Sequence, residues 1–311
     1  MGSLQRLSVK GKHAVITGAG SGINLAFARL LLSKGCSVLM ADLSLRPEAE
    51  TLLSEYSHPP LLQDTRSSAP SAFFHRTNVT SWKDLSSLWG KAVSTFPSID
   101  IVVPGAGIFE PRWSAFWKPP KTTTNPDSPS TDRFDAEPGT YASLDVNLTH
   151  PIRLSQLAVA HWTQTKTTGT LLHLSSTAGN DASIGTPLYY ASKHGLNAFV
   201  RSLGYLRDET GIRVCAVAPG AVMTPMWDGD KEAIKSGFDL FLTPEEVADA
   251  MLELCENEEY GDGTVLETLR NSRRVVPLYG NVKPEGNGAA SGFEEMEQDL
   301  YSMLNKDGLK V

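Results

Sequence analysis

The chain alternates short apolar runs with amphipathic stretches along most of its length. Apolar runs bounded by turn residues are typical of buried strands, and apolar residues spaced three or four apart are typical of helices. The first unit has an apolar run at 13–17, a glycine turn at 18–22, helical spacing at 25–34 and a second apolar run at 37–42. A strand, a helix and a strand in this order predict a βαβ unit with parallel strands.

The same alternation continues toward the carboxyl end of the chain. Alternating strands and helices predict an α/β fold, a mostly parallel sheet with helices on both faces. We expect further strands at 72–78, 99–104, 169–175, 212–218 and 264–267, and further helices at 82–96, 142–165, 189–209 and 244–256.

A proline-rich segment, 111–139, interrupts this alternation. It contains six prolines together with Trp113, Phe116 and Trp117. Two interpretations stay open: a long surface insertion, or a loop whose aromatic side chains reach a substrate pocket.

The tail after residue 267 also departs from the pattern. A glycine-rich stretch at 286–292 precedes a short helical pattern at 293–304. The tail is either a flexible terminal extension or a helix that contacts a partner.

Charge and composition narrow the class of protein. The 311 residues include 28 Lys and Arg against 35 Asp and Glu, a net charge of −7. Phosphate-backbone binding needs a basic face, and this chain has an acidic balance with scattered basic residues, so we expect no nucleic-acid partner. We find no amino-terminal apolar targeting region and no apolar run long enough for a membrane span. We therefore expect a cytoplasmic protein with no membrane partner.

The three cysteines, Cys36, Cys215 and Cys255, are far apart in the sequence. They form no CxxC motif and no cluster with histidine, so they predict neither a disulfide framework nor a metal site. We interpret them as small buried apolar residues.

The glycine turn is the first candidate for chemistry. A glycine-rich turn between a strand and a helix presents backbone N–H groups to a diphosphate. Gly18 and Gly20 fit the GxGxxG spacing, but Ile23 stands at the third position, so an ordinary tight turn is the alternative.

Asp42 adds a second signal at the end of the second predicted strand, 20 residues after Gly22. A carboxylate there can accept hydrogen bonds from both hydroxyls of an adenosine ribose and repels a 2′-phosphate. Leu43 follows it, and the turn at 17–23 has no basic residue, so NAD is favoured over NADP. The alternative is a solvated acid at a strand end.

The second half of the chain supplies an acid/base candidate. Tyr189 and Lys193 are four residues apart, on one face of a predicted helix, and Ser176 follows the strand before it. A nearby ammonium group lowers the pKa of a tyrosine. Such a tyrosine can take a proton from an alcohol as hydride leaves, while a serine holds the same oxygen.

These motifs together resemble the short-chain dehydrogenases/reductases, over about residues 8 to 268. The matching motifs are Thr17-Gly18-Ala19-Gly20-Ser21-Gly22-Ile23, Asp42, Ala106-Gly107, Asn147, Ser176, Tyr189-x-x-x-Lys193 and Pro219-Gly220, in the family's order. The resemblance implies a Rossmann-type, doubly wound parallel sheet in one domain at 8–268, with an insertion at about 111–139 and a C-terminal extension at 269–311. Within the family, the chain looks loosely most similar to fungal relatives of the NAD-dependent 15-hydroxyprostaglandin dehydrogenases.

The resemblance also implies the role of each matching residue. Tyr189 would be the acid/base, Ser176 would orient the substrate oxygen, Lys193 would bond the nicotinamide-side ribose, and Asn147 would bend its helix and hold a relay water. The remaining expected contacts all lie along an NAD molecule. They are Gly18, Ser21, Gly22 and Ile23 at the pyrophosphate, Asp42 and Leu43 at the adenosine ribose, Asn78 and Val79 at the adenine, Ala106 and Gly107 at the nicotinamide-side ribose, and Pro219, Gly220, Val222 and Thr224 at the carboxamide.

Two positions depart from the family pattern. Asn24 replaces the last glycine of the turn, which suggests a shifted helix or an added side chain near the cofactor. Pro104-Gly105 replaces an Asn-Asn pair, so we expect the side-chain hydrogen bonds that brace the central sheet to be missing.

The resemblance implies an enzyme that interconverts a secondary alcohol and a ketone, and a homodimer or homotetramer built on the helices at 147–165 and 189–209. The segment 225–243, with Met226, Trp227, Phe238, Leu240 and Phe241, and the aromatic insertion suggest an apolar small-molecule substrate; we expect a mobile lid at 227–235. Two alternatives stay open. One is a cofactor-binding regulatory protein with vestigial chemistry, and the other is a biosynthetic enzyme that catalyses a non-redox cyclisation or isomerisation.

Overall fold

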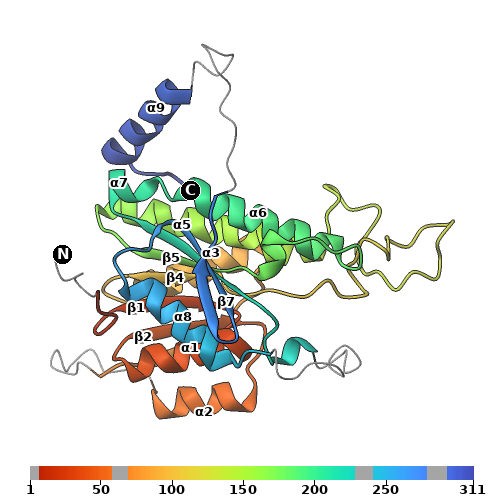
Figure 1. Cartoon of the computed structure of the whole chain (residues 1–311), viewed down its shortest axis with the longest axis horizontal. Coiled ribbons are helices and arrows are strands. Elements are labelled where there is room, and N and C mark those ends of the chain that lie inside the picture. The colour runs from red at the N-terminus through yellow and green to blue at the C-terminus, as the bar shows by residue number, and fades with distance from the viewer. Residues whose placement is uncertain (1–6, 58–68, 228–240, 279–292) are drawn as a thin grey trace.

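A computed structural model describes residues 7–57, 69–227, 241–278 and 293–311 and shows a single eight-stranded sheet (Figure 1). The strand order is β3-β2-β1-β4-β5-β6-β7-β8, and every neighbouring pair is parallel except β7 with β8. The sequence order reverses direction between β1 and β4, as in a Rossmann-type doubly wound sheet, which confirms the predicted fold. The strands are β1 (His13–Thr17), β2 (Ser37–Asp42), β3 (Ala72–Arg76), β4 (Ile101–Val103), β5 (Thr170–Leu174), β6 (Arg213–Pro219), β7 (Asp262–Leu269) and β8 (Ser272–Val275).

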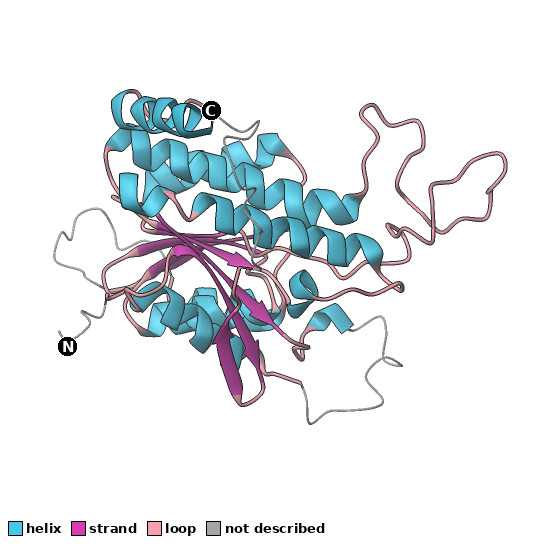
Figure 2. Ribbon diagram, turned by 45° about the horizontal axis from the view of Figure 1, so that its top comes forward, coloured by secondary structure: helices cyan, strands magenta, loops and turns pink. Residues whose placement is uncertain are grey.

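Helices cover both faces of the sheet, and Figure 2 shows them as a layer on each side of the strands. One face carries α1 (Gly22–Ser33), α2 (Pro47–Glu55) and α8 (Pro244–Glu256), whose apolar residues form one buried cluster. The other face carries α3 (Trp82–Thr95), α5 (His150–Thr165) and α6 (Pro187–Leu203), which form a second cluster. Central strands with two buried faces explain the continuous apolar runs in the sequence.

Both long predicted helices are interrupted. The helix expected at 142–165 divides into α4 (Ala142–Leu144), a π-helical turn at Asp145–Thr149, and α5. Pro151 has no N–H to donate to the carbonyl four residues before it, so a wider turn forms there. The helix expected at 189–209 begins earlier, at Pro187, ends at Leu203 and continues as α7 (Leu206–Thr210).

The sequence pattern did not predict the helix α2 or the strand β8. The short helix α2 begins with proline and buries only Ala49 and Leu52, which is too few residues for a clear periodicity. The edge strand β8 is exposed at every position, so it has no apolar alternation to detect. It extends the sheet beyond residue 268, and the domain boundary at that residue stays a prediction.

The carboxyl-terminal helix of the tail, α9 (Phe293–Lys306), confirms the helix expected at 293–304 and lies against the body of the protein (Figure 1). Leu304 is 3% exposed, and the backbone N–H of Leu309 donates to Oγ1 of Thr163 over 2.9 Å. Nζ of Lys166 donates to the carbonyl of Asn305 over 2.6 Å. The end of the tail therefore packs on the carboxyl end of α5, whereas the glycine-rich stretch at 286–292 lies outside the described residues.

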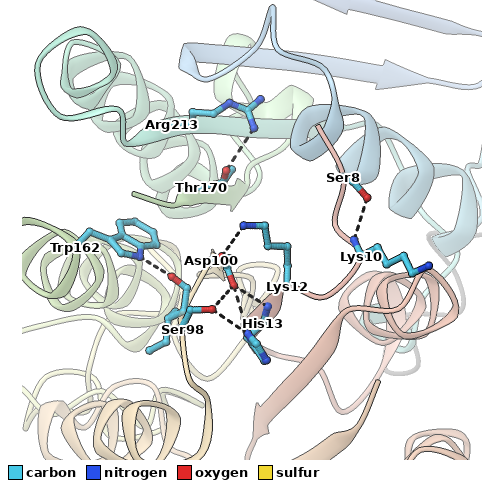
Figure 3. A network of polar contacts seen from close by, with 10 residues as sticks. Ser8, Lys10, Lys12, His13, Ser98, Asp100, Trp162, Thr170 and Arg213 are labelled. Atoms are coloured by element: carbon cyan, nitrogen blue, oxygen red, sulfur yellow. Dashed lines mark hydrogen bonds and ion pairs between the residues drawn. The ribbon is translucent and has the colours of Figure 1, made fainter. Parts of the chain in front are cut away.

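The amino-terminal edge of the sheet is held by a polar network around Asp100, just before β4 (Figure 3). Its carboxylate accepts from Nζ of Lys12, the backbone N–H of His13 and the hydroxyl of Ser98, over 2.8 to 3.0 Å. Burial alone would raise the pKa of Asp100, but these hydrogen bonds outweigh it and lower the pKa well below its ordinary value. This edge is thus stabilised by side chains, and the opposite edge carries the candidate site. No helix in the described ranges is both long and apolar enough to cross a bilayer.

Two buried histidines predict how stability depends on pH. Burial lowers the pKa of His150 to about 3 and that of His173 to about 4, against about 6.5 in an unfolded chain. Because the unfolded chain takes up protons that the folded chain does not, the free energy of unfolding is fully retained above pH ~6.5. It then decreases as the pH falls toward ~4, by up to ~1.4 kcal/mol per pH unit for each histidine.

Chemical denaturation of wild-type and His173→Gln proteins between pH 7 and 4 tests this expectation. The free energy of unfolding of the variant should fall less steeply with decreasing pH than that of the wild type, by about the contribution of one histidine, whatever its stability at pH 7. The exposed His194→Gln is the matched control and should keep the wild-type slope. Equal slopes in wild type and His173→Gln would contradict the assignment.

Candidate active site

The glycine turn between β1 and α1 lies directly against the loop that follows β4. Gly18 and Gly22 have φ of 72° and 58°, a region that glycine adopts without strain. A Cβ atom added to Gly18 would lie 2.7 Å from Cα of Ala106. Only glycine permits this contact, which brings the two expected halves of a cofactor site together.

The turn opens at the amino end of α1. The first backbone N–H groups of α1 have no helical acceptor, and within the described structure the side chain of Ser21, which precedes the helix, makes no capping hydrogen bond to them. A cavity of about 350 Å³ lies here, lined by Ser21, Gly22, Arg46 and Pro225 among others. A Cβ atom on Gly22 would lie 3.3 Å from Cγ2 of Thr224. This cradle suits an anionic group such as a diphosphate.

The carboxylate of Asp42 lies beside the turn at the end of β2. Its Oδ2 accepts from the backbone N–H of Gly20 over 2.9 Å, and its Oδ1 accepts from that of Leu43 over 2.7 Å. A carboxylate oxygen accepts more than one hydrogen bond, so both atoms can still receive ribose hydroxyls. The side chain of Leu43 is 56% exposed next to this position.

Tyr189, Ser176 and Lys193 converge at the carboxyl edge of β5 and β6. The side chain of Ser176 interacts with that of Tyr189 and acts to lower the pKa of the phenol, and Oγ of Ser176 donates to the carbonyl of Pro219 over 3.5 Å. Nζ of Lys193 lies 5.6 Å from the centre of the Tyr189 ring and donates to the carbonyl of Leu174 over 2.9 Å. The structure therefore brings together three of the four predicted catalytic residues at one point.

Burial controls the protonation of this group. It raises the pKa of Tyr189, and the hydrogen bond with Ser176 opposes that increase. Burial also lowers the pKa of Lys193 to about 8. The expected lowering of the tyrosine pKa by lysine is therefore not what the structure shows, because burial of the phenol is the dominant effect and raises the pKa.

Asn147, the fourth predicted catalytic residue, lies in the π-helical turn and is 1% exposed. Its Oδ1 accepts from the backbone N–H of Ile108 over 2.9 Å, and its Nδ2 donates to the carbonyl of the same residue over 2.8 Å. A Cβ atom on Gly107 would lie 3.4 Å from Oδ1 of Asn147 and 3.8 Å from Nζ of Lys193. Asn147 thus fixes the loop at Gly107 beside Lys193.

The remaining predicted residues lie around this centre. Val79 is 8% exposed, whereas Asn78 is exposed, and its Oδ1 accepts from the backbone N–H and the hydroxyl of Thr80. The backbone N–H of Gly220 donates to the carbonyl of Thr268 over 3.0 Å, and Val222 pairs with Leu242 in an isolated bridge. That bridge joins the two ends of 223–241. Most of the expected lid at 227–235 lies outside the described residues, as do Phe238 and Leu240 of the segment 225–243.

Sequence reasoning gave no role to three polar residues that shape the site. Arg46 precedes α2, and its backbone N–H donates to the carbonyl of Gly20 over 3.2 Å, which places a cation in the turn cavity. Thr17 and His150 are hydrogen-bonded over 3.1 Å beneath the loop at 105–106. The only sequence feature that could have placed Arg46 in the site is its position four residues after Asp42. No sequence feature indicates that Thr17 and His150 are in contact.

Asn24 and Gly105, the two departures from the family pattern, are in direct contact. Asn24 is 5% exposed, and its Nδ2 donates to the carbonyl of Gly105 over 2.8 Å. A Cβ atom on Gly105 would lie 2.6 Å from that nitrogen, so a side chain at 105 and one at 24 compete for the same space. The expectation that the brace is missing is therefore wrong, because the amide comes from α1 rather than from the loop after β4.

This exchange predicts strong coupling between positions 24 and 105. Gly105→Asn should destabilise the protein by about 1–3 kcal/mol, since it overpacks a filled site. Asn24→Gly should also destabilise it, because it removes the hydrogen bond and introduces glycine into a helix.

The double variant Asn24→Gly/Gly105→Asn should recover most of the stability that Gly105→Asn loses. Denaturant unfolding of all four proteins gives the interaction energy between the two positions. Costs that simply add would contradict a shared space.

Comparisons with known proteins agree with this geometry. The family model described as short chain dehydrogenase matches residues 12–235. The chain is 28% identical over 256 residues to cis-4-hydroxycyclohexanecarboxylate dehydrogenase of Sinomonas cyclohexanicum, covering 78% of this chain and 89% of that one. It is 28% identical over 260 residues to 7alpha-hydroxysteroid dehydrogenase of Escherichia coli, with 80% and 89% covered. It is 26% identical over 298 residues to human NAD(+) 15-hydroxyprostaglandin dehydrogenase, with 93% and 88% covered. The chain belongs to the short-chain dehydrogenase family and is an oxidoreductase acting on CH–OH groups.

Proposed function

We propose that this enzyme interconverts a secondary alcohol and a ketone on an apolar small molecule, with NAD(H) as cofactor and Tyr189 as acid/base. The observation that carries the proposal is the convergence of Tyr189, Ser176 and Lys193 at the carboxyl edge of the sheet. In open α/β sheets, ligands bind at this edge near the point where the strand order reverses.

The residues divide the reaction between them. Ser176 holds the substrate oxygen through its hydroxyl, and Tyr189 receives the hydroxyl proton of the alcohol as hydride leaves the carbinol carbon. The nicotinamide ring, when bound, accepts that hydride in oxidation and supplies it in reduction. Nζ of Lys193 lies 5.6 Å from the centre of the Tyr189 ring, and in our proposal its positive charge favours the ionised phenol while burial opposes ionisation. In our proposal Asn147 holds a water on Lys193 that carries the proton onward.

Three features support a nicotinamide cofactor and favour NAD. The glycine turn offers backbone N–H groups to the diphosphate, and Asp42 offers two acceptor oxygens to the adenosine ribose. Its negative charge opposes a 2′-phosphate. The similar human 15-hydroxyprostaglandin dehydrogenase is named as an NAD(+) enzyme. Arg29 and Arg46 line the same cavity and favour a phosphate group, so the binding of NADH and NADPH is compared directly below.

An apolar substrate is supported by an aromatic rim, which we define as Phe116, Trp117 and Ile184. The rings of Phe116 and Trp117 pack edge to face with centres 4.9 Å apart, and Nε1 of Trp117 donates to the carbonyl of Ile184 over 2.5 Å. All three side chains are at least half exposed. Exposed apolar side chains gathered in this way mark binding surfaces. The names of two relatives, a hydroxycyclohexanecarboxylate and a hydroxysteroid dehydrogenase, fit alicyclic alcohols.

We also propose that two or four copies of the chain associate through α5 and α6. Symmetric dimers and their multiples are the usual assemblies of such proteins. A mass measurement in solution distinguishes the two states.

Tyr189→Phe tests the chemistry. Loss of the hydroxyl should lower kcat by about 100-fold to 10,000-fold, because proton transfer loses its acid/base. The dissociation constant of NADH should change little, since the ring stays in place. The neighbouring Tyr190→Phe is the matched control. Steady-state rates on a panel of secondary alcohols and ketones give the comparison, and an unchanged kcat in Tyr189→Phe would contradict the assignment.

Asp42→Ala tests the cofactor choice. It should weaken NADH binding by about 10-fold to 100-fold, the value of hydrogen bonds to a charged group, and should strengthen NADPH binding. Asp42→Asn keeps the shape of the side chain and separates the loss of charge from any disturbance of Gly20. Fluorescence titration with NADH and NADPH measures both. An unaltered preference in both variants would rule out Asp42 as the discriminating residue.

A further inference from the structure

A buried carboxylate outside the catalytic group joins the proline-rich insertion to the helix that carries Tyr189. Glu110 lies just before the insertion, and it is 7% exposed. Its Oε1 accepts from the backbone N–H of Phe116 over 2.8 Å, and its Oε2 accepts from the backbone N–H of Tyr189 over 2.9 Å. One side chain therefore satisfies two backbone groups that lie far apart in the sequence.

The bond to Tyr189 replaces a missing helix cap. Thr186 precedes α6, and among the described residues it makes no side-chain capping bond. The first backbone N–H groups of a helix have no helical acceptor, and Tyr189 is the third residue of α6. A carboxylate at this end also interacts favourably with the helix dipole. Glu110 thus holds the first turn of α6 from outside the helix.

The bond to Phe116 fixes the aromatic rim. Phe116 stacks against Trp117, and Trp117 donates to Ile184, which lies just before α6. On the inner side, the ring of Phe109 packs against the ring of Tyr189, with centres 4.9 Å apart. The rim and the tyrosine are therefore tied to the same short segment, 109–117, which includes the first residues of the insertion.

We propose that Glu110 is a positioning residue that couples substrate contact at the aromatic rim to the placement of Tyr189. This proposal rests on the proposed function. An apolar substrate that packs on Phe116 and Trp117 orders the segment, and the two bonds of Glu110 transmit that order to the backbone of Tyr189. Small alcohols that do not reach the rim gain nothing from this coupling.

Glu110→Gln is the sharpest test of the coupling. Glutamine keeps the shape of the side chain, but its NH₂ group donates and cannot accept, so one of the two backbone N–H groups loses its partner. The carboxylate of Glu246 also accepts a backbone N–H at a helix start, that of Thr243 over 2.7 Å, far along the chain in α8. Glu246→Gln is therefore the matched control.

The kinetic arm compares a bulky alicyclic alcohol with 2-propanol. For the bulky substrate, Glu110→Gln should lower kcat about 10-fold, because misplacement of a catalytic group costs rate. For 2-propanol the change should be at most about 2-fold, and the dissociation constant of NADH should stay within about 2-fold. Glu246→Gln should behave as the wild type with both substrates. Equal losses on both alcohols would overturn the coupling and leave Glu110 with a merely structural role.

A second experiment measures hydrogen exchange and does not depend on catalysis. It can therefore test the role of Glu110 independently of the proposed function. Hydrogen exchange of the unliganded protein should show faster exchange at the amides of Phe116 and Tyr189 in Glu110→Gln, and at neither amide in Glu246→Gln. Unchanged exchange at both amides would overturn the proposal even if the enzyme is active. An inactive wild type with the expected exchange would instead refute the function alone.

Glu110→Asp covers the case in which Glu110→Gln does not fold. Its carboxylate is one methylene shorter, so it keeps the charge but reaches only one of the two amides. Protection of both amides in Glu110→Asp, with wild-type kcat on the bulky alcohol, would likewise overturn the proposal.

Discussion

The close approach of the loop after β1 to the loop after β4 is the contact on which the rest of the site depends. The buried hydroxyl of Thr17 accepts from the backbone N–H of Gly105 over 3.0 Å, and Gly18 has no side chain to separate the two loops. Neighbouring parallel strands lie about 5 Å apart, so loops at their carboxyl ends touch only when the side chains between them are small or absent. This contact sets the position of the cavity at the amino end of α1 and of the loop at Gly107 beside Lys193.

In the same region, the side-chain amide that bonds the Gly105 carbonyl comes from α1 rather than from the loop after β4. Asn24 on α1 fills the space that a side chain at position 105 would need, and it bonds the Gly105 carbonyl from the opposite side. The closely packed space beside Gly105 holds only one side chain, and here that side chain comes from α1.

The helix α6, which carries Tyr189 and Lys193, depends on distant residues in a similar way. Tyr189 and Lys193 owe their spacing to α6, but their depth in the protein comes from the elements around the helix. Glu110 holds its first turn, and the π-helical turn around Asn147 brings Gly107 beside Nζ of Lys193. The raised pKa of Tyr189 and the lowered pKa of Lys193 both result from that burial. No property of the Tyr-x-x-x-Lys motif itself predicts either shift.

Local information in the sequence was enough for seven of the eight strands, for the order of those elements and for the motif residues of the candidate site. Apolar runs and glycine turns depend on neighbours within a few positions, and the motif residues keep their identity whatever the fold does around them. The exposed strand β8 and the short helix α2 carry too few buried positions to leave such a pattern. The contacts between Asn24 and Gly105, Thr17 and His150, and Glu110 and Tyr189 were decided by the tertiary structure alone. Each joins residues that are far apart in the chain, and only the packing of several elements sets the distance between them.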